Sequence, residues 1–176
     1  MVEIITPILF VALFFRYGLT DFLFYKYSIL LGFLIPIFFI DAFQQIIPHV
    51  LSIPLIVVGF SLALIPGNDI GVLNALLTSL FVFCFLLLLA WGYQKLRGYE
   101  GLGGGDIWLL TGITAFFGIT GIPYIFLLSA LLGIIYFLIF VRDSNKPFAF
   151  GTFIAVAAVV WAIVGEQTIL DLIPYL

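Results

Sequence analysis

Long hydrophobic runs, separated by short polar or turn-forming stretches, divide the chain into about seven segments. Runs of this kind predict transmembrane helices, and proline, glycine and asparagine mark where they end. The predicted segments are, by residue number, 4–15, 22–40, 48–65, 70–93, 107–118, 123–141 and 148–165. The pattern predicts an all-α polytopic membrane protein of about seven transmembrane helices, with residues 1–176 forming a single membrane-embedded domain.

The composition agrees with a chain that lies mostly in lipid. Hydrophobic residues make up 65% of it and charged residues only 9%, whereas a soluble domain carries about 25% charge. The net charge of −3 gives no basic surface for nucleic acid. The single cysteine, Cys84, excludes an internal disulfide and a cysteine zinc cluster in this chain.

The fifth segment is too short for an ordinary membrane crossing. Its 12 residues, 107–118, give roughly 18 Å of helix at ~1.5 Å per residue, against a hydrocarbon core of about 30 Å. Either the bilayer thins there or the segment begins below the surface. In the second case Asp106, just before the segment, lies within the membrane in a cavity shielded by protein.

Basic residues predict which loops are cytoplasmic, because cytoplasmic loops carry an excess of Lys and Arg. If all seven segments cross, the loops after the second, fourth and sixth segments share one side, which holds Lys95, Arg97, Arg142 and Lys146. The opposite side holds Arg16 and Lys26. The richer side is therefore predicted to be cytoplasmic, with the N-terminus cytoplasmic and the C-terminus outside.

This topology brings two aspartates to the cytoplasmic side, Asp41 at the end of the second segment and Asp106 before the fifth. Neighbouring carboxylates cannot both ionise easily, so such a pair shares a proton. The ionised member can take a proton from water while the protonated member hydrogen-bonds a scissile carbonyl. Four of the six residues 101–106 are glycine, which would let a substrate backbone approach closely. The alternative is that the aspartates only cap helices, although an anion is disfavoured at a helix C-terminus, where Asp41 is predicted.

Three stretches of the chain resemble the motifs of a known family, the type IV prepilin peptidases, which are membrane aspartic proteases. Gly103-Gly104-Gly105-Asp106 fits the family's G-x-G-D motif. Asp41 and the following IPHVLSIP stretch, residues 47–54, are similar to the first catalytic aspartate and the sequence behind it. PFAFGTF, residues 147–153, resembles in altered form the family's P-F-G-P region.

The resemblance implies an aspartic endopeptidase that removes the short basic leader of type IV prepilins or pseudopilins at the cytoplasmic face of the inner (cytoplasmic) membrane. It implies Asp41 and Asp106 as catalytic residues, and it implies a loop or substrate-binding role for Gly103, Gly104, Gly105, Pro48 and His49. It implies no metal or cofactor, and it leaves the oligomeric state open.

The chain departs from the family pattern in three respects. Trp108 stands where the family often has Lys, and His49 stands where Asn or Asp is usual; His49 reads mainly as a polar loop residue. The paired C-x-x-C zinc motifs of bifunctional members have no counterpart in this sequence, so peptidase activity without methyl transfer is expected.

Other interpretations stay open at this point. A G-x-G-D protease of the presenilin or signal-peptide-peptidase kind is disfavoured, because Asp41 follows Ile40 instead of Tyr and no Pro-Ala-Leu motif is present. Paired intramembrane carboxylates also serve proton-coupled transporters, although no internal repeat is visible. A catalytically inactive assembly factor of a pilus or secretion system is the remaining alternative.

Overall fold

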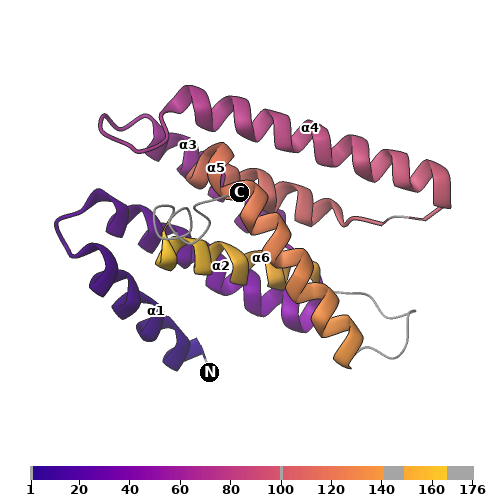
Figure 1. Cartoon of the computed structure of the whole chain (residues 1–176), viewed down its shortest axis with the longest axis horizontal. Helices are drawn as coiled ribbons and strands as arrows, with labels where there is room; N and C mark the ends of the chain where they lie inside the picture. The colour runs from indigo at the N-terminus through magenta and orange to yellow at the C-terminus, as the bar shows by residue number, and fades with distance from the viewer. Residues whose placement is uncertain (1, 100, 141–148, 166–176) are drawn as a thin grey trace, which may run out of the picture.

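The protein folds as a bundle of α-helices (Figure 1). The computed structural model describes residues 2–99, 101–140 and 149–165, and all regular secondary structure in them is helical. The helices are α1 (Val2–Tyr17), α2 (Phe22–Gln44), α3 (His49–Ala63), α4 (Val72–Arg97), α5 (Gly104–Phe140) and α6 (Phe150–Val164). The predicted all-α class is confirmed. Within the described residues, α2, α4 and α5 are long and apolar enough to cross a membrane, whereas the total of seven crossings stays a prediction.

The helices follow the predicted segments, with ends that differ by about one turn. The second predicted segment stops at residue 40, but α2 continues through Asp41 to Gln44, because packing of one helix face against the bundle stabilises a helix beyond its most apolar residues. The last segment was predicted to begin at Phe148, which lies outside the described residues, as do Arg142 and Lys146.

The fifth and sixth predicted segments meet directly within α5, and a break at Gly118 separates them. Gly118 has φ 63° and ψ −159°, a combination that is essentially restricted to glycine. In Figure 1 the chain changes direction sharply here, where the colour passes from salmon to orange, and the second half of α5 runs back across the bundle. The two segments are thus joined without an intervening loop.

The first half of α5 forms the centre of the bundle. Residues 109–118 are buried without exception, and α3, α4 and α6 all pack against α5. Glycines allow this close approach: a Cβ atom at Gly59 of α3 would lie 2.6 Å from the Ala115 Cβ, and one at Gly112 would lie 2.9 Å from Leu55 Cδ2. Small residues at such contacts are how helices pack tightly in membranes, where hydrophobicity alone does not drive them together.

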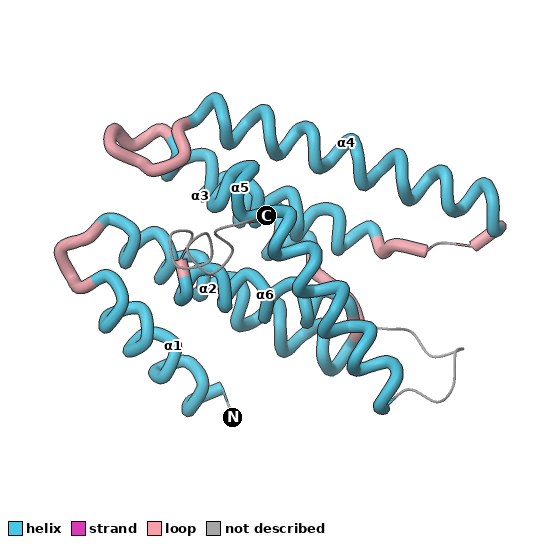
Figure 2. The backbone as a smooth tube through the Cα atoms, viewed as in Figure 1, coloured by secondary structure: helices cyan, strands magenta, loops and turns pink. Residues whose placement is uncertain are grey.

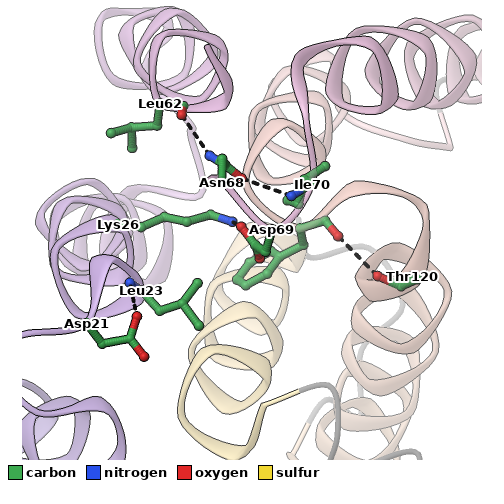
Figure 3. Close-up of polar contacts among 9 residues, drawn as sticks. Asp21, Leu23, Lys26, Leu62, Asn68, Asp69, Ile70 and Thr120 are labelled. Atoms are coloured by element: carbon green, nitrogen blue, oxygen red, sulfur yellow. Dashed lines mark hydrogen bonds and ion pairs between the residues drawn. The ribbon is translucent and has the colours of Figure 1, made fainter. Parts of the chain in front are cut away.

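Polar contacts hold the loops at one end of the bundle, the left side of Figure 2. Figure 3 shows Lys26 of α2, which is 1% exposed, with its Nζ 2.6 Å from Asp69 Oδ1 in the α3–α4 loop. Asn68 donates to the Leu62 carbonyl at 2.7 Å and accepts from the Ile70 amide at 2.9 Å. These contacts therefore hold the α3–α4 loop against the end of α3 and against α2.

At the opposite end, α4 extends beyond the start of α5 (Figure 1). The chain then folds back along the last turns of α4, because a Cβ at Gly101 would touch the ring of Tyr93, one turn before the end of that helix. The helix that carries Asp106 thus begins nearer the middle of the bundle than the end of α4 (Figure 1). Whether the bilayer thins there or Asp106 lies within the membrane stays a prediction.

Candidate active site

Asp41 lies in the last turn of α2 and is almost completely buried, with 4% of its surface exposed. The helix ends at Gln45, which adopts the left-handed conformation (φ 57°) and donates its N–H to the Asp41 carbonyl at 2.8 Å. That turn sends the chain across the end of the bundle to Pro48, where α3 begins. The sharp end of α2 therefore leaves the Asp41 side chain facing the bundle interior.

Asp106 lies in the first turn of α5, after the glycine loop. A Cβ at Gly103 would be 3.0 Å from Asp106 Oδ2, so the absence of a side chain at Gly103 lets the carboxylate fold back over the loop. The negative side chain is also favoured electrostatically at the N-terminus of a helix. Asp106 is thus held close to the loop backbone at the entrance of α5.

Ile47 fills the space between the helices that carry the site. A Cβ at Gly105 would lie 2.8 Å from the Ile47 Cβ, and a Cβ at Gly151 in α6 would touch the Ile47 Cδ1. Ile47 itself is buried. The two glycines therefore allow α5 and α6 to approach Ile47 from different sides, and this packing fixes the distance between the elements that carry the site.

Asp41 and Asp106 line one pocket of about 400 Å³ at this end of the bundle. Its other lining residues are Gln45, Ile46, Ile47, His49, Gly103, Gly104, Gly105 and Phe150. Two carboxylates that line one pocket can share a proton when they lie close together. The pocket thus brings together both predicted catalytic residues, the three predicted loop glycines and His49.

Pro48 occupies a different place from the other predicted site residues. It precedes the first turn of α3, and its carbonyl accepts the N–H groups of Leu51 at 3.0 Å and Ser52 at 3.3 Å. It does not line the pocket. In this structure Pro48 sets the direction of α3, and it affects the pocket through its neighbours Ile47 and His49.

The two residues that depart from the family pattern, His49 and Trp108, contact each other. The ring of His49 packs edge-on against Trp108, with centroids 6.1 Å apart and an interplanar angle of 70°, and Phe83 lies on another side of Trp108 at 5.2 Å. Edge-to-face packing of this kind is favourable. His49 therefore joins the pocket wall to an aromatic cluster between α3, α4 and α5.

Thr152 in the first turn of α6 is a site residue that our sequence analysis missed. Its amide N–H and its hydroxyl both donate to Asp41 Oδ2, at 2.5 Å and 2.8 Å. The residues are 111 positions apart in the chain, and a single threonine has no local signature of such a contact. Its place in the stretch 147–153 was the only available signal.

The described part of the chain contains no group of three or more His, Cys, Asp or Glu side chains placed to hold a metal ion. The acid–base groups of the pocket are the two aspartates and His49. These groups can transfer protons to and from water or a substrate carbonyl.

The fold and the pocket define a helical membrane protein with two carboxylates that line one pocket. The model of the type IV leader peptidase family matches residues 28–138, a range that contains Asp41, Asp106 and the glycine loop. The chain belongs to this family.

Relatives at about one-third identity agree with this assignment. A prepilin leader peptidase/N-methyltransferase of Neisseria gonorrhoeae is 31% identical over 157 residues, which cover 89% of this chain and 54% of that protein. Proteins of the same description from Pseudomonas aeruginosa and Xanthomonas campestris pv. campestris are 35% and 32% identical, covering 73% and 89% of this chain and 45% and 55% of their own lengths. The chain thus spans about half the length of these relatives. No solved structure matches it.

Proposed function

We propose that this protein is an intramembrane aspartic endopeptidase that removes the leader peptides of type IV prepilins or pseudopilins. One observation carries the proposal: Asp41 and Asp106, from opposite ends of two different helices, line the same pocket. Membership of the type IV leader peptidase family supports the substrate class. We propose peptidase activity alone, without the N-methyltransferase activity that also appears in the names of the relatives.

The proposed reaction uses the two carboxylates as one acid–base unit. The ionised carboxylate takes a proton from a water molecule, whose oxygen attacks the scissile carbonyl carbon. The protonated carboxylic acid donates a hydrogen bond to the carbonyl oxygen and stabilises the charge that develops there. When the C–N bond breaks, the leaving amine receives the proton that came from water. Gly103 and Gly104, both exposed at the pocket edge, leave room for an extended substrate backbone.

We also propose that the pocket faces the cytoplasm from the inner membrane. Lys95 and Arg97 are exposed in the last turns of α4, at the end of the bundle where the pocket lies. Lys26 and Arg16 belong to the other end, beside the α1–α2 loop. An excess of Lys and Arg marks the cytoplasmic side, and a prepilin leader would meet the pocket there before export.

The decisive experiment is cleavage of a purified prepilin by the purified chain in detergent or liposomes, followed by gel shift and N-terminal sequencing. We expect the wild-type chain to remove the leader. Asp41→Asn and Asp106→Asn should each abolish cleavage, while a cooperative melting transition shows that both variants stay folded. Glu3→Gln, at an exposed acid of α1, is the matched control and should cleave normally. A wild-type chain that leaves prepilin intact would overturn the proposal, and proton flux in the same liposomes would then favour a transporter.

A further inference from the structure

Asp41 is held through one of its two oxygens. Oδ2 accepts both the amide N–H and the hydroxyl of Thr152, and a Cβ at Gly151 would lie 3.1 Å from the same oxygen. No donor among the described residues reaches the other oxygen, Oδ1. Hydrogen bonds to a carboxylate are short and strong, so the two bonds fix the rotation of the carboxylate and present Oδ1 to the pocket.

The start of α6 makes this contact favourable. Asp41 lies at the C-terminal end of α2, where the helix dipole disfavours an anion. Its carboxylate also meets the first turn of α6, a helix of 15 residues, whose N-terminal N–H groups attract an anion. Gly151 is required for the approach, since a side chain there would touch both Asp41 and Ile47.

The hydroxyl of Thr152 differs in its partner from the hydroxyls of Thr111 and Thr114. Thr111 and Thr114 are buried in α5, and each donates to the carbonyl one turn back in its own helix, at 2.7 Å and 2.6 Å. That is the common arrangement inside helices. The hydroxyl of Thr152 instead reaches across to another helix and to a group of the proposed acid–base pair.

From these contacts we infer that Thr152 is the positioning residue of the aspartate pair. It holds Asp41 by Oδ2 so that Oδ1 faces the water and Asp106 during the reaction. The expected effect on cleavage rests on the proposed peptidase function. The expected coupling between Thr152 and Asp41 rests on the hydrogen bonds alone.

The kinetic test compares Thr152→Val, Thr152→Ser and the control Thr114→Val in prepilin cleavage. Valine keeps the shape and the backbone N–H of Thr152 but removes the hydroxyl, so we expect kcat to fall roughly tenfold or more with KM within about twofold. Serine retains the hydroxyl and should restore most of kcat. Thr114→Val removes a buried hydroxyl that bonds within α5, away from Asp41, and should leave kcat near the wild-type value.

A second measurement does not depend on activity. Thermal unfolding of Thr152→Val, Asp41→Asn and the double variant forms a double-mutant cycle, and directly bonded groups should give non-additive losses. Additive losses, a Thr152→Val enzyme with wild-type kcat, a serine variant that fails to restore kcat, or an equal loss in Thr114→Val would each overturn the inference. If the losses of stability are non-additive but the wild-type chain cleaves no prepilin, only the proposed function is refuted.

Discussion

At the scale of single residues, the site depends on the absence of side chains as much as on the two carboxylates. Gly103, Gly105 and Gly151 each stand where an added Cβ would meet Asp106, Ile47 or Asp41. Protein interiors are packed too densely to absorb such a change without movement. The glycines therefore set the geometry of the pocket, and chain flexibility is a secondary consequence.

Replacing Gly105 with Ala tests this packing. The new Cβ would lie 2.8 Å from the Ile47 Cβ, so Ile47 must move, at a cost of about 1–3 kcal/mol and with loss of cleavage. Gly92→Ala in α4 is the control, because nothing lies within 4 Å of its added Cβ and alanine stabilises a helix by roughly 0.5–1 kcal/mol. Equal cleavage and equal melting temperatures for the two variants would contradict the packing argument.

The contact between His49 and Trp108 predicts energetic coupling of the two residues. Removing the His49 ring with His49→Ala should cost about 0.5–1.5 kcal/mol of stability, and the cost should largely disappear when Trp108 is already Leu. Melting temperatures of the two single variants and the double variant measure this coupling. Fully additive effects would show that the edge-on packing contributes nothing.

The sequence predicted the residues of the site that have a local signature. Asp41 and Asp106 each border a hydrophobic run, and Gly103 to Gly105 precede Asp106 directly. Thr152, by contrast, reaches Asp41 across 111 residues, and the His49–Trp108 contact joins two helices. Contacts of this kind depend on how helices pack, which hydrophobic pattern and turn residues do not specify.

At the scale of the helices, Gly118 decides the shape of α5. The fifth predicted segment ends at Gly118 and the sixth begins at Pro123, whereas in the structure residues 119–122 are already helical. What the pattern could not show is that no loop is needed there. A single glycine in an unusual conformation makes the turn, and Ile70 and Asn74 pack against it.

Gly118→Ala should therefore destabilise the protein strongly. Alanine pays about 1–3 kcal/mol for this backbone conformation, and its Cβ would lie 2.9 Å from Ile70 Cγ2. Gly32→Ala in α2 meets nothing within 4 Å and serves as the reference in thermal unfolding. Equal melting temperatures for the two variants would contradict the break in α5 at Gly118.

At the scale of the whole molecule, the two ends of the bundle have different tasks. The pocket occupies one end, while the other is closed by the ion pair between Lys26 and Asp69. Breaking a buried ion pair is costly mainly because a charge is left without its partner. Lys26 is 1% exposed, whereas the Asp69 side chain is 40% exposed.

The difference in exposure between Lys26 and Asp69 predicts which of two single variants is less stable. Asp69→Asn leaves the buried ammonium of Lys26 without its carboxylate and should lower the melting temperature more than Lys26→Met, which leaves a carboxylate that water can reach. Prepilin cleavage below the melting temperature should change little in either variant, since the pocket is at the other end. A larger loss in Lys26→Met would mean that the packing of Lys26 matters more than its charge.

The same separation of the ends predicts the outcome of cysteine labelling. Cys84, which is exposed on α4, is first replaced by Ala. Cysteines at the exposed positions Gln44 and Tyr99 should then react with a membrane-impermeant reagent only from the cytoplasmic face, and a cysteine at Ile65 only from the outside. Labelling of Gln44 and Tyr99 from opposite faces would contradict both the topology and the shared pocket.

The turn at Gly118 also bears on how the protein enters the membrane during synthesis. Residues 107–140 carry no charged side chain, so no charged loop has to be carried across the bilayer between the two halves of α5. The halves can insert together as one hairpin, and the basic residues on both sides of it in the sequence, Lys95 and Arg97 before and Arg142 and Lys146 after, then favour the same orientation. A single pair of flanking basic clusters would thus orient both halves of α5, including the helix that carries Asp106.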